Sequence, residues 1–226
     1  DNMKISEVII PKEILLLIVF CVALNLLRVV MFDTLSLIYL LWNIFLAFLP
    51  FLISSTLTWH AQHAQVSNVE LLAGGVIWLL LFPNAPYLIT DFVHLGETNA
   101  APMWFDIMLI FTCAWVGLEF AYYSLLQIER LLRRKFSEVS VQLLILPLLW
   151  FSGLGIYLGR VLRFNSWDIL AAPQSLFYEV LNIFLGKSYF PEALYFTMLF
   201  FVFMWVTYTA WKLKLGVLVI PAKTIS

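Results

Sequence analysis

Six long apolar runs dominate this chain of 226 residues and restrict what it can fold into. A helix needs about 20 mainly apolar residues to cross the hydrocarbon core of a bilayer, and each run reaches that length. Because backbone groups in lipid must satisfy their own hydrogen bonds, such runs predict helices. The predicted spans are residues 13–32, 34–57, 70–93, 103–127, 139–162 and 191–212. No long linker divides them, so we expect an all-α integral membrane protein: one domain over residues 1–226, built as a bundle of six transmembrane helices.

The composition supports this fold class. The chain is 63% hydrophobic and 12% charged, whereas soluble domains are about half apolar and a quarter charged. A net charge of -1 gives no reason to expect a nucleic-acid partner, so membrane lipids are the expected surroundings. A second copy or another membrane protein stays open as a partner. The first run lacks a small-residue cleavage site and is predicted to be a retained span.

The lysines and arginines predict the orientation, because cytoplasmic loops are enriched in both. One side would hold Lys4, Lys12, Arg130, Arg133, Arg134, Lys135, Lys212, Lys214 and Lys223, and the other Arg28, Arg160, Arg163 and Lys187. We therefore expect a multi-pass protein of the plasma membrane with both termini in the cytoplasm.

A short amphipathic helix is predicted over residues 174–185, between the fifth and sixth spans. Apolar side chains such as Phe177 and Leu181 fall on one helical face, and polar ones such as Glu179 and Asn182 on the other. The segment is too short to cross a bilayer. It would either lie on the outer leaflet or cover the end of the bundle.

The third span is interrupted by the stretch FPNAPYLITD, residues 82–91. Pro83 and Pro86 each remove a backbone donor, and the residues before them, Phe82 and Ala85, are biased toward extended geometry. Asn84 could cap a restarted half-helix. Four polar residues follow at spacings of three, four and three, which puts them on one face: Asn84, Tyr87, Asp91 and His94. That face is predicted to look into the bundle; the simpler interpretation is a proline kink that ends in an Asp-His pair.

The fourth and fifth spans add charged residues at the same outer boundary. Asp106 follows Trp104 and is either a first-turn residue favoured by the helix dipole or part of a site. Gly155 and Gly159 form a G-x-x-x-G pair that permits close helix contact. Beyond them come Arg160, Arg163, Asn165, Trp167 and Asp168. Two arginines on the outer side are unusual, and we expect them to pair with Asp91, Asp106 and Asp168; snorkelling arginines beside an interfacial tryptophan are the alternative.

Other polar residues receive smaller roles. Asn25 and Arg28 end the first span and could join the outer cluster, while Asn43 is expected to bond across helices. His60 and His63 are interpreted as loop histidines, because no cysteine or carboxylate nearby completes a metal site. No cofactor or metal is predicted, and no common hydrolase or nucleotide motif occurs.

The segments FPNAPYLITDFVHL, MWFD and GIYLGRVLRFNSWDIL resemble the signature of the domain-of-unknown-function 1361 family, prokaryotic multi-spanning membrane proteins. The similarity extends from the second span to the last. The matching positions are Pro83, Asn84, Pro86, Tyr87, Asp91, His94, Trp104, Asp106, Gly159, Arg160, Arg163, Asn165, Trp167 and Asp168. The resemblance implies six-helix membrane topology, and it carries no activity with it.

Three classes of function fit an outward polar site made of Asn84, Tyr87, Asp91, His94, Asp106, Arg160, Arg163, Asn165, Trp167 and Asp168. The first is binding or transport of a small anionic solute or lipid headgroup. The second is an enzyme acting on a lipid-linked phosphate, with the two arginines holding phosphate, Asp91 or His94 as base, and Asp106 and Asp168 orienting groups or holding a metal. The third is a structural or accessory subunit. The lack of a catalytic motif weighs against the enzyme.

Overall fold

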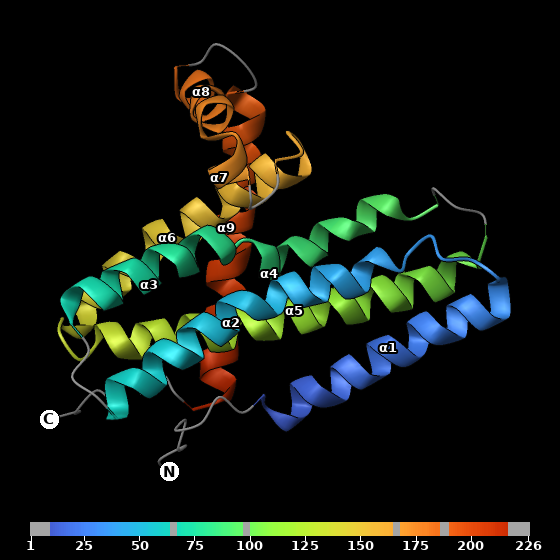
Figure 1. The fold of residues 1–226 in the computed structure, drawn as a ribbon, viewed down its shortest axis with the longest axis horizontal. Helices are drawn as coiled ribbons and strands as arrows, with labels where there is room; N and C mark the ends of the chain where they lie inside the picture. The colour runs from blue at the N-terminus through green and yellow to red at the C-terminus, as the bar shows by residue number, and fades with distance from the viewer. Residues whose placement is uncertain (1–9, 64–66, 97–99, 165–167, 186–189, 217–226) are drawn as a thin grey trace, which may run out of the picture.

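The computed structural model describes residues 10–63, 67–96, 100–164, 168–185 and 190–216, and no strand occurs among them. Six helical segments in this part of the chain are long and apolar enough to cross a membrane, which confirms the expected all-α membrane bundle. The long helices are α1 (Lys12–Phe32), α2 (Tyr39–His63), α3 (Asn68–Leu81), α5 (Met103–Leu132), α6 (Glu138–Arg160) and α9 (Phe190–Lys214). The short ones are α4 (Asn84–Tyr87), the 3-10 helix η1 (Leu88–His94), α7 (Asp168–Ala171) and α8 (Pro173–Phe184). In Figure 1, α5 runs between α1 and α2, and α9 crosses the other long helices steeply.

The second span differs from its predicted bounds at both ends. Asp33 closes α1 in the left-handed conformation, with φ of 48°, and a turn precedes the start of α2 at Tyr39. At its other end α2 continues to His63, so the expectation that His60 and His63 lie in a loop was wrong. Both rings pack against Trp59 on the last turns of the helix. A helix can continue through polar residues where it leaves the hydrocarbon, so the histidines do not end it.

The third span does not become extended at its prolines. Phe82 and Pro83 keep right-handed helical torsions, so the expected extended geometry at Phe82 was wrong. The amide of Ala85 donates to the Phe82 carbonyl at 3.1 Å, which supplies the bond that Pro86 cannot make. The chain therefore continues as α4 and η1. Asn84 is the first residue of α4 rather than its cap, and no side chain caps this helix.

Glycines on two helices make room for α4. A Cβ at Gly117 of α5 would lie 2.3 Å from the carbonyl oxygen of Ala85. On α6, a Cβ at Gly155 would lie 2.6 Å from Pro83 Cγ, and one at Gly159 would lie 3.2 Å from the Tyr87 ring. The G-x-x-x-G pair thus faces the irregular part of the third span, which is wedged between α5 and α6.

Two buried polar networks link the helices elsewhere in the bundle, and neither was predicted. In one, Ser54 of α2 bonds to Gln127 at 2.5 Å and to Ser124 at 3.2 Å. The same Ser124 hydroxyl accepts a 2.6 Å bond from the Trp78 indole. These contacts join α2, α3 and α5 through buried hydroxyl, amide and indole groups, which are the usual polar links between membrane helices.

The second network anchors α9 to the far end of α5. The buried carboxylate of Glu129 accepts bonds from Lys212 Nζ at 3.0 Å, Tyr208 Oη at 2.6 Å and Arg133 Nη2 at 2.7 Å. Nearer the start of α5, Glu119 accepts bonds from the indoles of Trp115 and Trp211. Carboxylates of α5 thereby fix the steeply crossing last helix.

The short helix α8 (Pro173–Phe184) packs against the end of the bundle, which is one of the two placements that its pattern allowed. Ile183 is buried and packs with Tyr157 of α6 and Ala193 of α9. Phe177, by contrast, is 64% exposed on the same helix. The helix therefore covers the end of the α6–α9 pair (Figure 1) and leaves apolar side chains directed outward.

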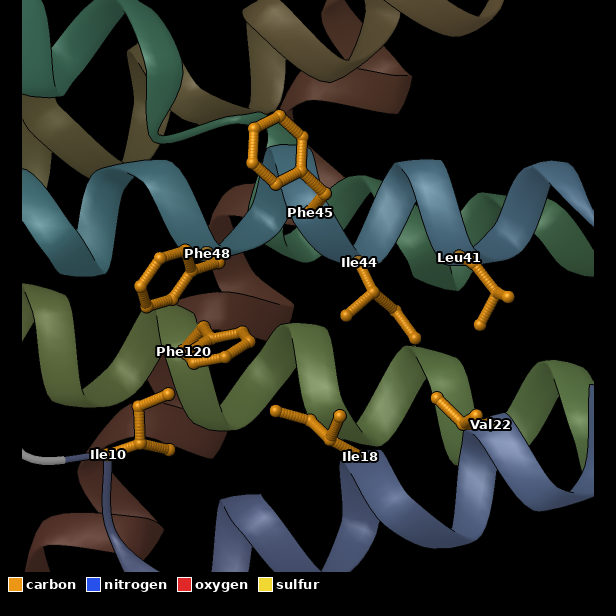
Figure 2. A pocket seen from close by; sticks show the side chains of 8 residues that line it. All are labelled: Ile10, Ile18, Val22, Leu41, Ile44, Phe45, Phe48 and Phe120. Carbon is orange, nitrogen blue, oxygen red and sulfur yellow. The ribbon is translucent and has the colours of Figure 1, made fainter.

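An apolar groove of about 290 Å³ lies between α1 and α2 above α5. Figure 2 shows Ile18 and Val22 of α1 facing Leu41 and Ile44 of α2, with Phe120 of α5 between the two helices. All of the described residues that line this groove are apolar, which suits contact with lipid chains.

Candidate functional site

Asp91 and Arg160 form a buried ion pair at one end of the bundle. Asp91 lies on η1 and is 1% exposed, and Arg160 is the last residue of α6. One guanidinium nitrogen, Nη2, bonds to Asp91 Oδ1. The second carboxylate oxygen, Oδ2, accepts a 3.0 Å bond from the Asn43 side-chain amide of α2. Three spans therefore meet at one carboxylate.

The other two nitrogens of the Arg160 guanidinium also have partners on the third span. Nε donates to Thr90 Oγ1 at 2.7 Å, and Nη1 lies 2.9 Å from His94 Nε2. The Tyr87 ring stacks on the guanidinium, 4.2 Å from its centre, in a cation–π contact. We call Asn43, Tyr87, Thr90, Asp91, His94 and Arg160 the Arg160 cluster.

A second buried ion pair joins α1 to α5. Arg28 Nε lies 2.7 Å from Asp106 Oδ1, and Nη2 lies 3.2 Å from Oδ2, so the contact is bidentate. The remaining nitrogen donates to Ser36 Oγ at 2.9 Å. Asp106 thus binds Arg28, and the expectation that it would pair with Arg160 or Arg163 was wrong. The reason is geometric, because α1 packs along α5 and its last turns place Arg28 beside the first turn of α5.

The other predicted site residues lie outside these two ion pairs. Arg163 is exposed, has a φ of 60° beyond the end of α6, and forms no ion pair with any residue between 10 and 216 that the structure describes. Asp168 is half-buried at the start of α7, and Asn84 is half-buried at the start of α4. Asn165 and Trp167 lie outside the described residues.

Sequence reasoning identified four of the six members of the Arg160 cluster as site residues and gave Asn43 a cross-helix bond, which it makes. Thr90 was missed. It precedes Asp91, and on a regular helix adjacent residues point in different directions, so nothing in the pattern singled it out. The fork of the guanidinium is wide enough to reach both side chains.

The two buried aspartates at this end of the bundle are both neutralised by arginines. Each buried aspartate meets one arginine, which compensates both charges in a medium where an unpaired ion is very costly. Within the described part of the chain, no three His, Cys, Asp or Glu side chains gather closely enough to hold a metal ion.

These features define a multi-pass helical membrane protein with two buried arginine–aspartate pairs at one end. A family model described as "Protein of unknown function (DUF1361)" matches residues 42–207, so the chain belongs to that family, as its signature segments predicted. No curated protein and no solved structure matches the chain. The matched region contains Asp91, Asp106 and Arg160, while Arg28 lies before it.

Proposed function

We propose that the protein is a non-catalytic structural or accessory subunit of the plasma membrane. Its outer polar cluster holds three spans in a fixed arrangement. The observation that carries the proposal is that the polar atoms of the Asp91–Arg160 pair are all engaged within the chain. Both oxygens of Asp91 and all three guanidinium nitrogens of Arg160 contact side chains of this same chain.

The energetics favour a structural role for such a cluster. A site reserved for a solute keeps donors or acceptors available for it, because binding has to replace the water that the solute loses. The Arg160 guanidinium instead exchanges its hydration for Asp91, Thr90 and His94. An anionic ligand would have to displace the Asp91 carboxylate from a nearly inaccessible position.

The orientation in this proposal has both termini in the cytoplasm and the Arg160 cluster at the outer boundary. The support is the basic sequence after α5, where Arg133, Arg134 and Lys135 are all exposed. Lysines and arginines concentrate in cytoplasmic loops.

Arg163 favours a second candidate function, the binding or transport of a small anionic solute or lipid headgroup at the outer surface. Its side chain is exposed just beyond Arg160 and carries a charge that no described carboxylate neutralises. A half-helix N-terminus adds nothing here, since Phe82 and Ala85 at the start of α4 are fully buried. The enzyme alternative is less well supported, because both of its candidate bases contact Arg160: Asp91 through an ion pair, and His94 through Nε2, which lies 2.9 Å from Nη1.

The test compares Asp91→Asn, Arg160→Gln and the double variant by thermal unfolding in detergent. A fluorogenic maleimide reports unfolding, because Cys21 and Cys113 are both buried. Breaking a buried ion pair on one side costs about 3–5 kcal/mol, so each single variant should melt well below the wild type and the double variant should recover part of the loss. Phosphate and sulfate should leave the wild-type melting temperature unchanged.

The opposite result would support ligand binding. If phosphate or sulfate stabilises the wild type, and Arg160→Gln and Arg163→Gln abolish that effect, the cluster holds an anion and the structural proposal is wrong.

A further inference from the structure

A cleft of about 570 Å³ opens among α2, α3, α5 and α6 at the end of the bundle opposite the Arg160 cluster. Its walls are apolar, with Leu71 and Val76 from α3, Leu131 from α5 and Leu148 from α6 among them. The volume falls within the range of about 300–1,000 Å³ typical of ligand pockets. The cleft is open to its surroundings, since Leu72 at its edge is 71% exposed.

The cleft has the depth of one membrane leaflet. Its lining on α3 runs from Asn68 to Leu79. At 1.5 Å per residue that distance is about 16 Å, and half of a hydrocarbon core of about 30 Å is about 15 Å. The cleft thus extends along α3 from Asn68, at the start of the helix, past the buried Trp78, over a length close to that of one leaflet.

Positive charge is concentrated at the boundary end of the cleft. Lys135 lines it and donates a hydrogen bond to the side-chain oxygen of Asn68, which is a neutral acceptor. Beside it, Arg134 donates to the Ala61 carbonyl at 2.6 Å, which is also neutral. Arg133 differs, because Glu129 and Glu138 neutralise it. The carboxylate of Glu70, on the first turn of α3, accepts capping bonds from Ser67 and forms no ion pair with Lys135 or Arg134.

We propose that this cleft binds one anionic phospholipid, with an acyl chain between α3 and α6 and its phosphate headgroup against Lys135 and Arg134. An apolar slot about one leaflet long, with two cations at its end that pair with no described carboxylate, matches both parts of such a lipid. Basic pockets between membrane helices on the cytoplasmic side are known recognition sites for anionic headgroups. The described lining of the groove between α1 and α2 contains no cation, so we do not assign it a preference for anionic lipid. The leaflet assignment alone rests on the proposed orientation; binding itself is independent of the structural role of the Arg160 cluster.

Gly75 provides a way to fill the cleft. It lies in the cleft wall, and no neighbouring atom is within 4 Å of where its Cβ would be. A leucine there occupies the acyl space without a clash at its first carbon. Ala73 is exposed on the same helix outside the cleft, so Ala73→Leu adds apolar bulk without filling it.

The experiment is native mass spectrometry of the purified protein in detergent, titrated with dioleoyl phosphatidylglycerol or dioleoyl phosphatidylcholine. Each Lys or Arg near a membrane surface contributes about a fivefold preference for anionic lipid, so the two cations should give the wild type about a 25-fold preference for phosphatidylglycerol. Lys135→Gln and Arg134→Gln should each reduce it about fivefold. Lys12→Gln changes an exposed lysine of α1 that does not line the cleft and should leave the preference unchanged. Gly75→Leu should weaken the binding of both lipids, while Ala73→Leu should not.

Several outcomes would overturn the proposal. If the wild type binds the two lipids with equal affinity, the cleft does not recognise an anionic headgroup. Unchanged selectivity in Lys135→Gln and Arg134→Gln would show that these two cations do not bind it. If Gly75→Leu binds both lipids as tightly as the wild type does, the acyl chain does not lie in this cleft. Displacement of the lipid by inorganic phosphate alone would show that the cations hold a free anion instead. Should Gly75→Leu fail to fold, Val76→Phe fills the same cleft from a position that is already 49% exposed.

Discussion

Gly117 of α5 lies directly against the carbonyl oxygen of Ala85, at the tip of the irregular third span. A methyl group at Gly117 would stand 2.3 Å from that oxygen, closer than any side-chain carbon can approach a backbone atom. Because the obstacle is backbone, one of the two helices has to move. We expect Gly117→Ala to lower the free energy of unfolding by about 1–3 kcal/mol, the usual cost of overpacking. Thermal unfolding in detergent measures it.

Gly75→Ala is the matched control, because its new methyl group meets no neighbouring atom within 4 Å. Helix propensity alone should then stabilise the protein slightly, by up to about 1 kcal/mol. A Gly117→Ala variant as stable as Gly75→Ala would show that α4 does not pack against α5 as described.

Asp106→Asn should be among the most destabilising single substitutions in the chain. It removes the carboxylate that binds two nitrogens of the Arg28 guanidinium, and Arg28 is only 1% exposed. Loss of one partner of a buried pair costs about 3–5 kcal/mol, and Arg28→Gln in the same molecule should return part of it. Asp33→Asn is the control, since Asp33 is exposed and asparagine tolerates its left-handed conformation. Equal melting of the two asparagine variants would contradict the importance of the pair.

Gln127→Met tests the buried network of α2, α3 and α5. The side chain keeps its length but loses the oxygen that accepts from Ser54 and the nitrogen that donates to Ser55. Leaving buried hydroxyls short of a partner should cost about 1–3 kcal/mol in unfolding free energy. Gln142→Met, at an exposed position of α6, should cost close to nothing. A loss of the same size at both positions would assign the effect to the substitution type and not to the network.

Single cysteines test the proposed orientation. Ser175→Cys on α8 and Gln62→Cys at the end of α2 are both exposed and belong to opposite ends of the bundle. Background labelling should be low, because Cys21 and Cys113 are both buried. In intact cells a membrane-impermeant maleimide should label Ser175→Cys and should reach Gln62→Cys only after the membrane is permeabilised. The reverse pattern would place both termini outside.

The sequence allowed the spans and the depth of polar residues to be predicted, but not the direction in which each residue faces. Hydropathy and basic residues placed Asp91, Asp106 and Arg160 at one membrane boundary. Which arginine each aspartate meets depends on how the helices are rotated and which helices are neighbours. Arg28 reaches Asp106 because α1 packs on α5, and no local pattern contains that information.

Local proline rules also failed where tertiary packing opposed them. Phe82 precedes a proline and should avoid helical torsions, yet it remains helical with its ring fully buried. Close contact of α4 with Gly117 and Gly155 leaves space only for a compact backbone. The glycines themselves were visible in the sequence, but the partner that they accommodate was not.

The Arg28–Asp106 pair has a consequence for biogenesis. Its members are 78 residues apart, so the first helix carries its arginine for a considerable time before the fourth span exists. At a synthesis rate of about 5–20 residues per second, the interval is roughly 4 to 16 seconds. During this time the first helix lacks the carboxylate that balances its charge. The emergence of α5 therefore marks the earliest moment at which α1 can settle into its final position in the membrane.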